Sequence, residues 1–221
     1  MRPIHLIPLS GNGHGGLDGA VRPRPAVENG GPWTGAASAA VADPSLARAP
    51  VATREPRLDR LEQLAVAMAR TFGTPCRIQP TTLDISFALD ARRNQYYSTS
   101  ILQRLEQTAD PDARILGVTN CDLFVPVLTF VFGEAQLDGN CAVVSLARLG
   151  DEFYGLPPRE ELLRERLIKE AGHELGHTFG LRHCSDWQCI MASSHAVERL
   201  DVKGAAFCER CRKPLQRNGY W

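Results

Sequence analysis

Apolar side chains recur at helical spacing in two long stretches of the chain. They are spaced three or four apart over residues 58–72, and Gly73 follows as a helix stop signal. The same spacing predicts a longer helix over residues 157–179 and a shorter one over 97–107. In the longer helix, the residues expected to form a stripe toward the core are Leu163, Leu167, Ala171 and Leu175.

Short apolar runs between these helices predict β-strands. They lie at residues 3–9, 76–79, 114–119, within 123–132, and at 142–146. Helices and strands alternate in the first half, and strands then gather before the last long helix. This order favours an α/β fold, which some schemes class as α+β, with a mixed, mostly parallel sheet covered by helices.

Residues 10–56 do not follow either pattern. The segment is rich in Gly, Ala and Pro and contains few large apolar residues. A loop of this length is unusual inside a compact domain, so we expect a disordered insertion. The 221 residues suffice for a single domain with a small appendage, and we assign residues 1–221 to one domain.

Charge and hydropathy exclude several classes of partner. Lys and Arg together number 25, as do Asp and Glu, so a formal net charge of zero gives no reason to expect nucleic acid or an anionic membrane. Asp122 and Pro126 interrupt the most apolar stretch, which is therefore unsuited to crossing a bilayer. The apolar run at 4–9 is too short for a secretory signal. We expect a cytoplasmic monomer.

The string HELGHTFGLRH in the last long helix carries the strongest chemical signal. His173 and His177 are one helical turn apart, so both imidazoles can point to one ion. Glu174 lies beside the first histidine and can reach a water bound to that ion. Gly180 allows a sharp turn that returns His183 as a third ligand. HExxH alone also fits an ordinary helix with a solvated face, but the added glycine and histidine argue against that alternative.

The residue types indicate what this site would do. Three neutral histidines leave a zinc ion its full charge and an open fourth position, which is typical of catalytic zinc. Glu174 would accept a proton from water and pass it to the leaving amine. His5 and His195 lack this spacing, and we expect structural roles for them. Gly172 and Gly176 each cost about 1 kcal/mol in a helix interior, which indicates a functional constraint there.

A cluster of cysteines follows directly. Four residues separate Cys184 from Cys189, two separate Cys208 from Cys211, and eighteen lie between the pairs. This spacing resembles a four-cysteine structural zinc site in a small C-terminal subdomain over residues 184–221. Two disulfides or redox-active thiols are the alternatives, and the expected cytoplasmic location disfavours them. We expect buried free thiols at the other cysteines, Cys76, Cys121 and Cys141.

Together these motifs resemble one family, the archaemetzincins. The string HExxHxxGxxH is followed by a cysteine, then CxxxxC, a methionine and a distal CxxC, and family-like segments occur at 93–99, 122–126, 130–135 and 153–157. The resemblance implies a metzincin-like domain with one catalytic and one structural zinc. It assigns the first ion to the three histidines, with Glu174 as base, and the second to the four cysteines. Met191 would be the methionine that metzincins place below the zinc, with simple core packing as the alternative.

The combined interpretation is a zinc metallopeptidase that hydrolyses peptide or protein substrates. An extended substrate would pair with an edge strand, for which residues 142–146 are the candidate. Arg182 and residues 193–195 are candidates for stabilising the oxyanion, with solvated loop residues as the plainer alternative. A non-catalytic zinc-binding module and a zinc hydrolase of non-peptide amides are the alternative functions.

Overall fold

The structure, a computed structural model, describes residues 2–11, 55–108, 110–217 and 219. All of these residues belong to one compact unit. The disordered insertion expected over residues 10–56 lies, apart from its two ends, outside the described residues.

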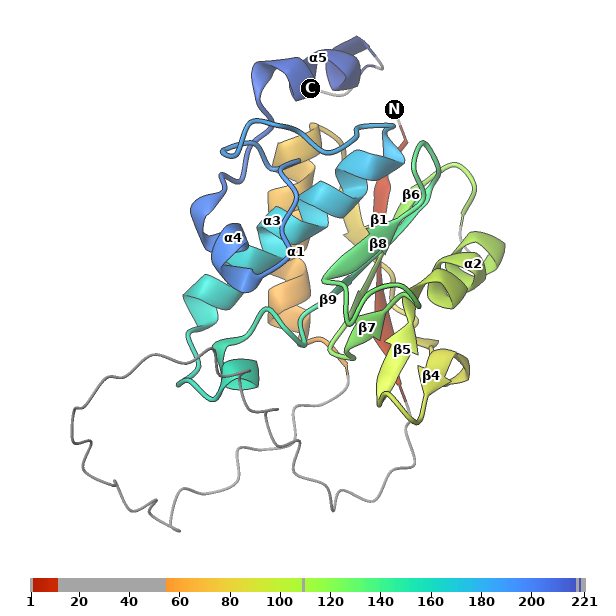
Figure 1. The fold of residues 1–221 in the computed structure, drawn as a ribbon. Coiled ribbons are helices and arrows are strands. Elements are labelled where there is room, and N and C mark those ends of the chain that lie inside the picture. The colour runs from red at the N-terminus through yellow and green to blue at the C-terminus, as the bar shows by residue number, and fades with distance from the viewer. Residues whose placement is uncertain (1, 12–54, 109, 218, 220–221) are drawn as a thin grey trace, which may run out of the picture. The chain divides into compact units, whose positions relative to one another are not determined.

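A mixed sheet forms the centre of this unit (Figure 1). Its strand order is β2-β1-β6-β9-β8, and β3 also pairs with β1. All pairings are parallel except the one between β9 and β8, which is antiparallel. The mostly parallel sheet predicted from the sequence is therefore confirmed. The strands are β1 (Ile4–Ser10), β2 (Cys76–Ile78), β3 (Leu83–Asp84), β6 (Arg114–Thr119), β8 (Gly133–Ala135) and β9 (Cys141–Ser145).

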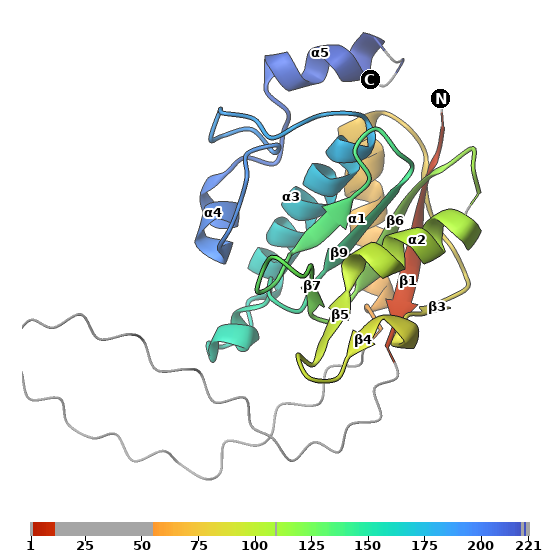
Figure 2. The same ribbon diagram turned by 45° about the vertical axis from the view of Figure 1, so that its right-hand side comes forward.

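Helices cover both faces of this sheet. Figures 1 and 2 show α1 and α3 on one face and α2 on the other. A small second sheet has the order β4-β5-β7, with strands β4 (Leu89–Asp90), β5 (Gln95–Tyr97) and β7 (Leu123–Phe124).

The helices are α1 (Leu58–Phe72), α2 (Ser98–Thr108), α3 (Glu160–Thr178), α4 (Val197–Val202) and α5 (Glu209–Arg217), with 3₁₀ turns η1 (Ser86–Ala88) and η2 (Asp151–Tyr154).

The central strands are buried on both faces, which explains why their sequences are continuously apolar. In β6, Leu116 and Val118 join the core beneath α1 and α3, whereas Ile115 joins the core beneath α2. In β9, Val144 belongs to the core beneath α1 and α3, and Val143 belongs to the core beneath α2. This alternation follows from the two-residue period of a strand.

The long helix starts later than its sequence pattern predicted. It begins at Glu160 and not at Pro157, because Pro158 disfavours a helical conformation at the residue before it. The predicted core stripe is confirmed, and its four members are all buried: Leu163, Leu167, Ala171 and Leu175. The sequence did not predict β8, α4 or α5.

A buried arginine fixes α3 to its surroundings. Arg166 donates hydrogen bonds to the Asp151 carboxylate at 2.8 Å and to the Asp201 carboxylate at 2.7 and 2.8 Å. It also donates to the carbonyl of Leu149 at 2.7 Å, and Arg159 binds the second oxygen of Asp151. These bonds join η2, α3 and α4. The positive charges of the two arginines are balanced by the negative charges of the two carboxylates to which they donate.

Candidate active site

Three histidines converge at the C-terminal end of α3. The Nε2 atoms of His173 and His177 lie 3.1 Å apart, as expected for residues one turn apart. The chain then turns at Gly180, whose φ of 79° is the left-handed conformation anticipated from the sequence. This turn stacks the ring of His183 against that of His173, with 5.3 Å between centroids. One nitrogen from each ring falls within 4.8 Å of the other two, so the trio could hold a metal ion.

Two of the rings are held in a fixed tautomer. The Nδ1 atom of His173 lies 2.9 Å from the carbonyl of Ile190, and that of His177 lies 2.7 Å from the carbonyl of Leu181. A carbonyl can only accept, so each Nδ1 carries the hydrogen and each Nε2 presents its lone pair to the shared centre. Burial lowers the pKa of His173 to about 2 and also lowers that of His177, which keeps both neutral.

Glu174 lies beside this trio on α3 and is almost fully buried. Gly133 of β8 packs against its side chain: a β-carbon added at Gly133 would come 2.6 Å from Glu174 Cγ. Burial, and next the charge of Glu170, raise the pKa of Glu174 well above its ordinary value. A carboxyl group with a raised pKa is suited to accept a proton. A role for Gly133 beside Glu174 was not predicted from the sequence, since a single strand glycine carries no distinctive signal.

Met191 and Ile190 lie beneath the same helix. Gly172 and Gly176 face these two side chains, and an added β-carbon would come 2.4 Å from Ile190 Cδ1 and from Met191 Sδ respectively. The helix glycines therefore allow the segment after the histidines to approach α3 closely. This explains why the sequence accepts their cost in helix propensity.

The cleft at the histidines consists of two adjoining hollows of about 380 and 300 Å³. Both are lined by residues of the trio, by Glu174 and by Gly133. Arg182, an exposed side chain, lines the first hollow, and residues 193–195 line the second. The candidate oxyanion groups thus line different hollows of the cleft.

The strand at the edge of this cleft is β8, not the run at residues 142–146. That run corresponds to β9, which pairs with β6 on one side and β8 on the other, so the edge-strand assignment from sequence was wrong. Phe132 and Gln136 bond to β9 at 2.8 and 3.0 Å. Because this bonding alternates along a strand, Gly133 and Ala135 direct their backbone groups toward the open edge.

The four C-terminal cysteines also come together. Their sulfur atoms all lie within 4.8 Å of one another, and the Cys184 and Cys208 sulfurs are 3.7 Å apart. All four are free thiols, so the disulfide alternative does not apply to this arrangement. The backbone N–H groups of Met191 and Cys208 point to the sulfur of Cys189 at 3.5 and 3.3 Å. Such a set of donors fits a closed, four-thiolate metal site.

Arg210 lies beside this cluster. Its guanidinium donates to Cys184 Sγ at 3.1 Å. Burial raises the pKa of Cys184, but the hydrogen bonds from Arg210, from the backbone of Asp186 and from the neighbouring cysteines together outweigh it and lower that pKa to about 7. A positive charge therefore lies beside the cluster, where it favours the thiolate form of Cys184. The remaining cysteines lie elsewhere, and burial raises the pKa of Cys141 to about 12.

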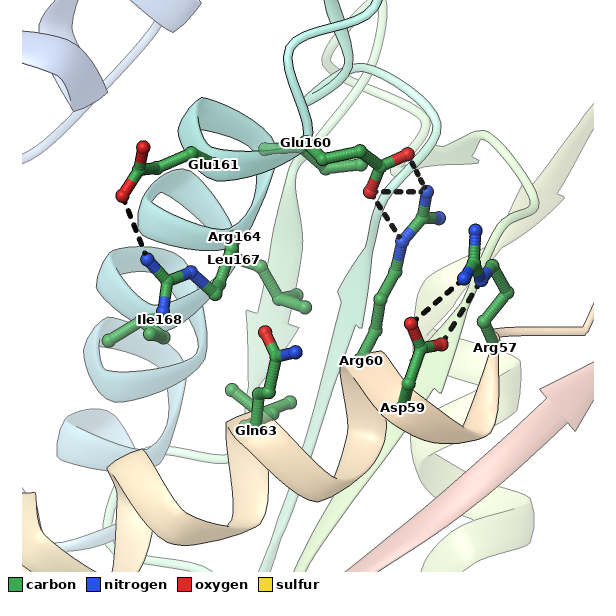
Figure 3. A pocket seen from close by; sticks show the side chains of 11 residues that line it. Arg57, Asp59, Arg60, Gln63, Glu160, Glu161, Arg164, Leu167 and Ile168 are labelled. Carbon is green, nitrogen blue, oxygen red and sulfur yellow. Dashed lines mark hydrogen bonds and ion pairs between the residues drawn. The ribbon is translucent and has the colours of Figure 1, made fainter.

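Another hollow, of about 330 Å³, lies away from the histidines between α1 and the start of α3 (Figure 3). Its charged side chains pair with one another: Arg57 with Asp59, and Arg60 with Glu160 at 2.6 Å. These are exposed surface pairs, and they do not point to a ligand.

Comparison with known proteins decides the class of the molecule. The sequence model of peptidase family M54 matches residues 78–217, well over half of the chain. The chain belongs to peptidase family M54. This M54 chain is 43% identical over 162 residues to the archaemetzincin of Methanocaldococcus jannaschii, a match that covers 73% of this chain and 88% of that one.

Two solved structures extend the comparison of this M54 chain. One is archaemetzincin from Archaeoglobus fulgidus complexed with malonate, at 38% identity and a TM-score of 0.63. The other is a zinc-dependent peptidase from Methanocorpusculum labreanum, at 31% identity and a TM-score of 0.66. Each match covers 72% of this chain and 94% of the other. The resemblance to archaemetzincins is therefore confirmed.

Membership in M54 makes the chain a zinc metallopeptidase, with peptides or proteins as its class of substrate. It favours this function over the non-catalytic binding module and the non-peptide amide hydrolase. Among the described helices, none has the length and apolar character that a membrane crossing requires.

Proposed function

We propose that the chain hydrolyses peptide bonds at the histidine cluster, with Glu174 as the general base. His173, His177 and His183 would be the ligands of one zinc ion. Zinc at such a site lowers the pKa of a bound water and polarises the substrate carbonyl. The observation that carries the proposal is the position of Glu174: its buried side chain forms part of the wall of both hollows, beside all three histidines.

Residues of the chain would transfer the proton, orient the histidines and limit the access of water. Glu174 accepts a proton from the attacking water and delivers it to the nitrogen of the leaving amine. The Nδ1 hydrogen bonds of His173 and His177 keep the two rings oriented during this transfer. Burial of the carboxylate in a wall that includes Gly133 limits the access of bulk water to it.

The substrate would bind as an extended strand alongside β8. The backbone groups of Gly133 and Ala135 face the open edge and can pair with a peptide that runs antiparallel to β8. In that orientation, the residues before the scissile bond lie toward Leu137 and Arg182. Those after it lie toward the hollow lined by Phe130, Phe132 and residues 193–195.

The four cysteines would bind a second, structural zinc ion. Four thiolates would complete the coordination of that ion and leave no position for a substrate. The resulting subdomain, residues 184–221, would belong to a single metzincin-like domain, with Met191 beneath the catalytic site. Zinc in such a site can contribute on the order of 10 kcal/mol to folding.

Cleavage of a fluorogenic peptide library by zinc-loaded protein tests the catalytic proposal. Glu174→Gln should abolish cleavage while the zinc content stays equal to that of the wild type. Glu165→Gln is the matched control, since Glu165 is an exposed glutamate on the same helix, and it should cleave normally. Equal cleavage by the wild type and by Glu174→Gln would refute the assignment of the base.

A further inference from the structure

Two oppositely charged side chains lie buried behind Glu174. Glu170 is 5% exposed and Lys203 is 3% exposed. The Nζ atom of Lys203 lies 3.5 Å from Glu170 Oε2 and donates a hydrogen bond to the carbonyl of Ala192 at 3.3 Å. The mechanism described above uses neither residue.

The pair joins two parts of the chain at the active site. Glu170 lies on α3, one turn before Glu174, and lines the same hollow as His173. At this spacing its side chain lies on the same face of α3 as that of Glu174, and both line this hollow. Lys203 follows α4 in the segment after Met191, and its ammonium reaches beneath the helix from there. Glu170 is therefore a neighbour of both the Lys203 ammonium and the Glu174 side chain.

The stability of the fold does not by itself explain why Glu170 and Lys203 are buried together. Removing two charges from water is unfavourable, and a protein with well-packed apolar residues in their place is often equally stable. Arg166, on the same helix, offsets such a cost with close hydrogen bonds to Asp151 and Asp201. The contact of Lys203 with Glu170 is longer, and it lies against the base.

We propose that Glu170, neutralised by Lys203, is a positioning residue for Glu174, an inference that rests on Glu174 being the base. Two neighbouring carboxylates repel each other, and the ammonium of Lys203 allows them to lie together. Glu170 then holds the Glu174 side chain from behind and directs it toward the histidines. Lys203 makes this positioning depend on the C-terminal segment.

Substitution of either partner should slow turnover without loss of zinc. Glu170→Gln leaves the Lys203 ammonium without its partner, so that it draws Glu174 away from the histidines. Lys203→Met leaves two carboxylates in repulsion. We expect kcat to fall about 10- to 100-fold in each, with KM within about twofold of the wild type, as is typical when a partner of an active-site group is removed.

The double variant separates positioning from plain stability. Glu170→Gln/Lys203→Met retains an amide that can donate to Glu174 and leaves no unpaired ammonium. We expect kcat of the double variant to be at least about tenfold higher than kcat of Glu170→Gln. Two independent sites would not show such a coupling. Asp201→Asn is the matched control, because it weakens the Arg166 network on the same helix: it should lower the unfolding midpoint and leave kcat unchanged.

These measurements are made on folded, zinc-loaded protein, with zinc content and thermal unfolding recorded for every variant. If kcat in both single variants stays within about twofold of the wild type, or falls no more than in Asp201→Asn, the positioning role is wrong. Glu174→Gln, assayed in parallel, keeps the two proposals distinct. Loss of cleavage in that variant alone would refute only the role of Glu170, whereas undiminished cleavage in it would refute the base.

Discussion

Met191 lies directly beneath Gly176 on the underside of α3. A β-carbon at Gly176 would come 2.4 Å from Met191 Sδ and 3.3 Å from Phe207 Cε1. Both neighbours are buried, at 0% and 2% exposure. The glycine thus sets the distance between the histidine helix and the segment that carries Met191.

Replacement of the two helix glycines should have unequal effects. Gly176→Ala forces buried Met191 and Phe207 to move, and we expect the free energy of unfolding to fall by about 1–3 kcal/mol. Gly172→Ala meets only the terminal methyl of Ile190 at close range, and alanine favours the helix by about 1 kcal/mol, so its loss should be smaller. Denaturant unfolding of both variants measures the difference. Equal losses would contradict the role given to Met191.

A proline in β8 should distinguish its two sides. Ala135→Pro removes an N–H that faces the open edge, so we expect KM for peptides to rise several-fold with little change in stability. Glu134→Pro removes an N–H that bonds to β9, and should destabilise the fold. Ala135→Ser is the control that keeps the N–H. Peptide kinetics and thermal unfolding check these outcomes, and an unchanged KM in Ala135→Pro would exclude strand pairing at β8.

Loss of one clustered cysteine should cost one metal ion. Cys208→Ser leaves three thiols, and we expect zinc content to fall by about one ion per chain and the unfolding midpoint to fall sharply. Cys76→Ala, outside the cluster, should retain all its zinc. Metal analysis by mass spectrometry, combined with thermal unfolding, measures both effects. Retention of full zinc content by Cys208→Ser would remove the cluster as a metal site.

Acid should destabilise the fold through Asp151. Hydrogen bonds from Arg159 and then Arg166 lower its pKa below the ordinary 3.8. Its contribution to stability is therefore complete above pH 3.8 and is lost as the pH falls toward the lower pKa of the folded state. In Asp151→Asn, the free energy of unfolding should depend less on pH below about 5. Asp112→Asn, at an exposed position, is the control, and an unchanged slope in Asp151→Asn would contradict this assignment.

The sequence predicted the histidine cluster well because its geometry is local. The interval from His173 to His177 is one helical turn, and Gly180 controls the return of His183. The edge strand was not predicted because Gly133 and Ala135 have low strand propensity and the strand has three residues. The continuous apolar run at 142–146 argued against an edge position for that strand. Such a run is typical of an inner strand of a parallel sheet, which is buried on both faces.

The contact of Glu170 with Lys203 could not be predicted from the sequence for a different reason. Thirty-three positions separate the two residues, and their approach depends on how α4 returns beneath α3. No periodicity records such a contact. One clue was available: Glu170 lies one turn before Glu174, on the same face of a helix already assigned to the site.

His183 and Cys184 are consecutive, and the Cys184 N–H is bonded to the carbonyl of Met191 at 2.8 Å. A single peptide bond therefore joins one ligand of the proposed catalytic ion to one ligand of the proposed structural ion. Occupancy of either site should raise affinity at the other by the same factor, because linkage between binding equilibria is reciprocal. Titration of metal-free protein with zinc should then show a higher affinity at the histidine site once the cysteine site is filled than in a variant that lacks the cysteine site.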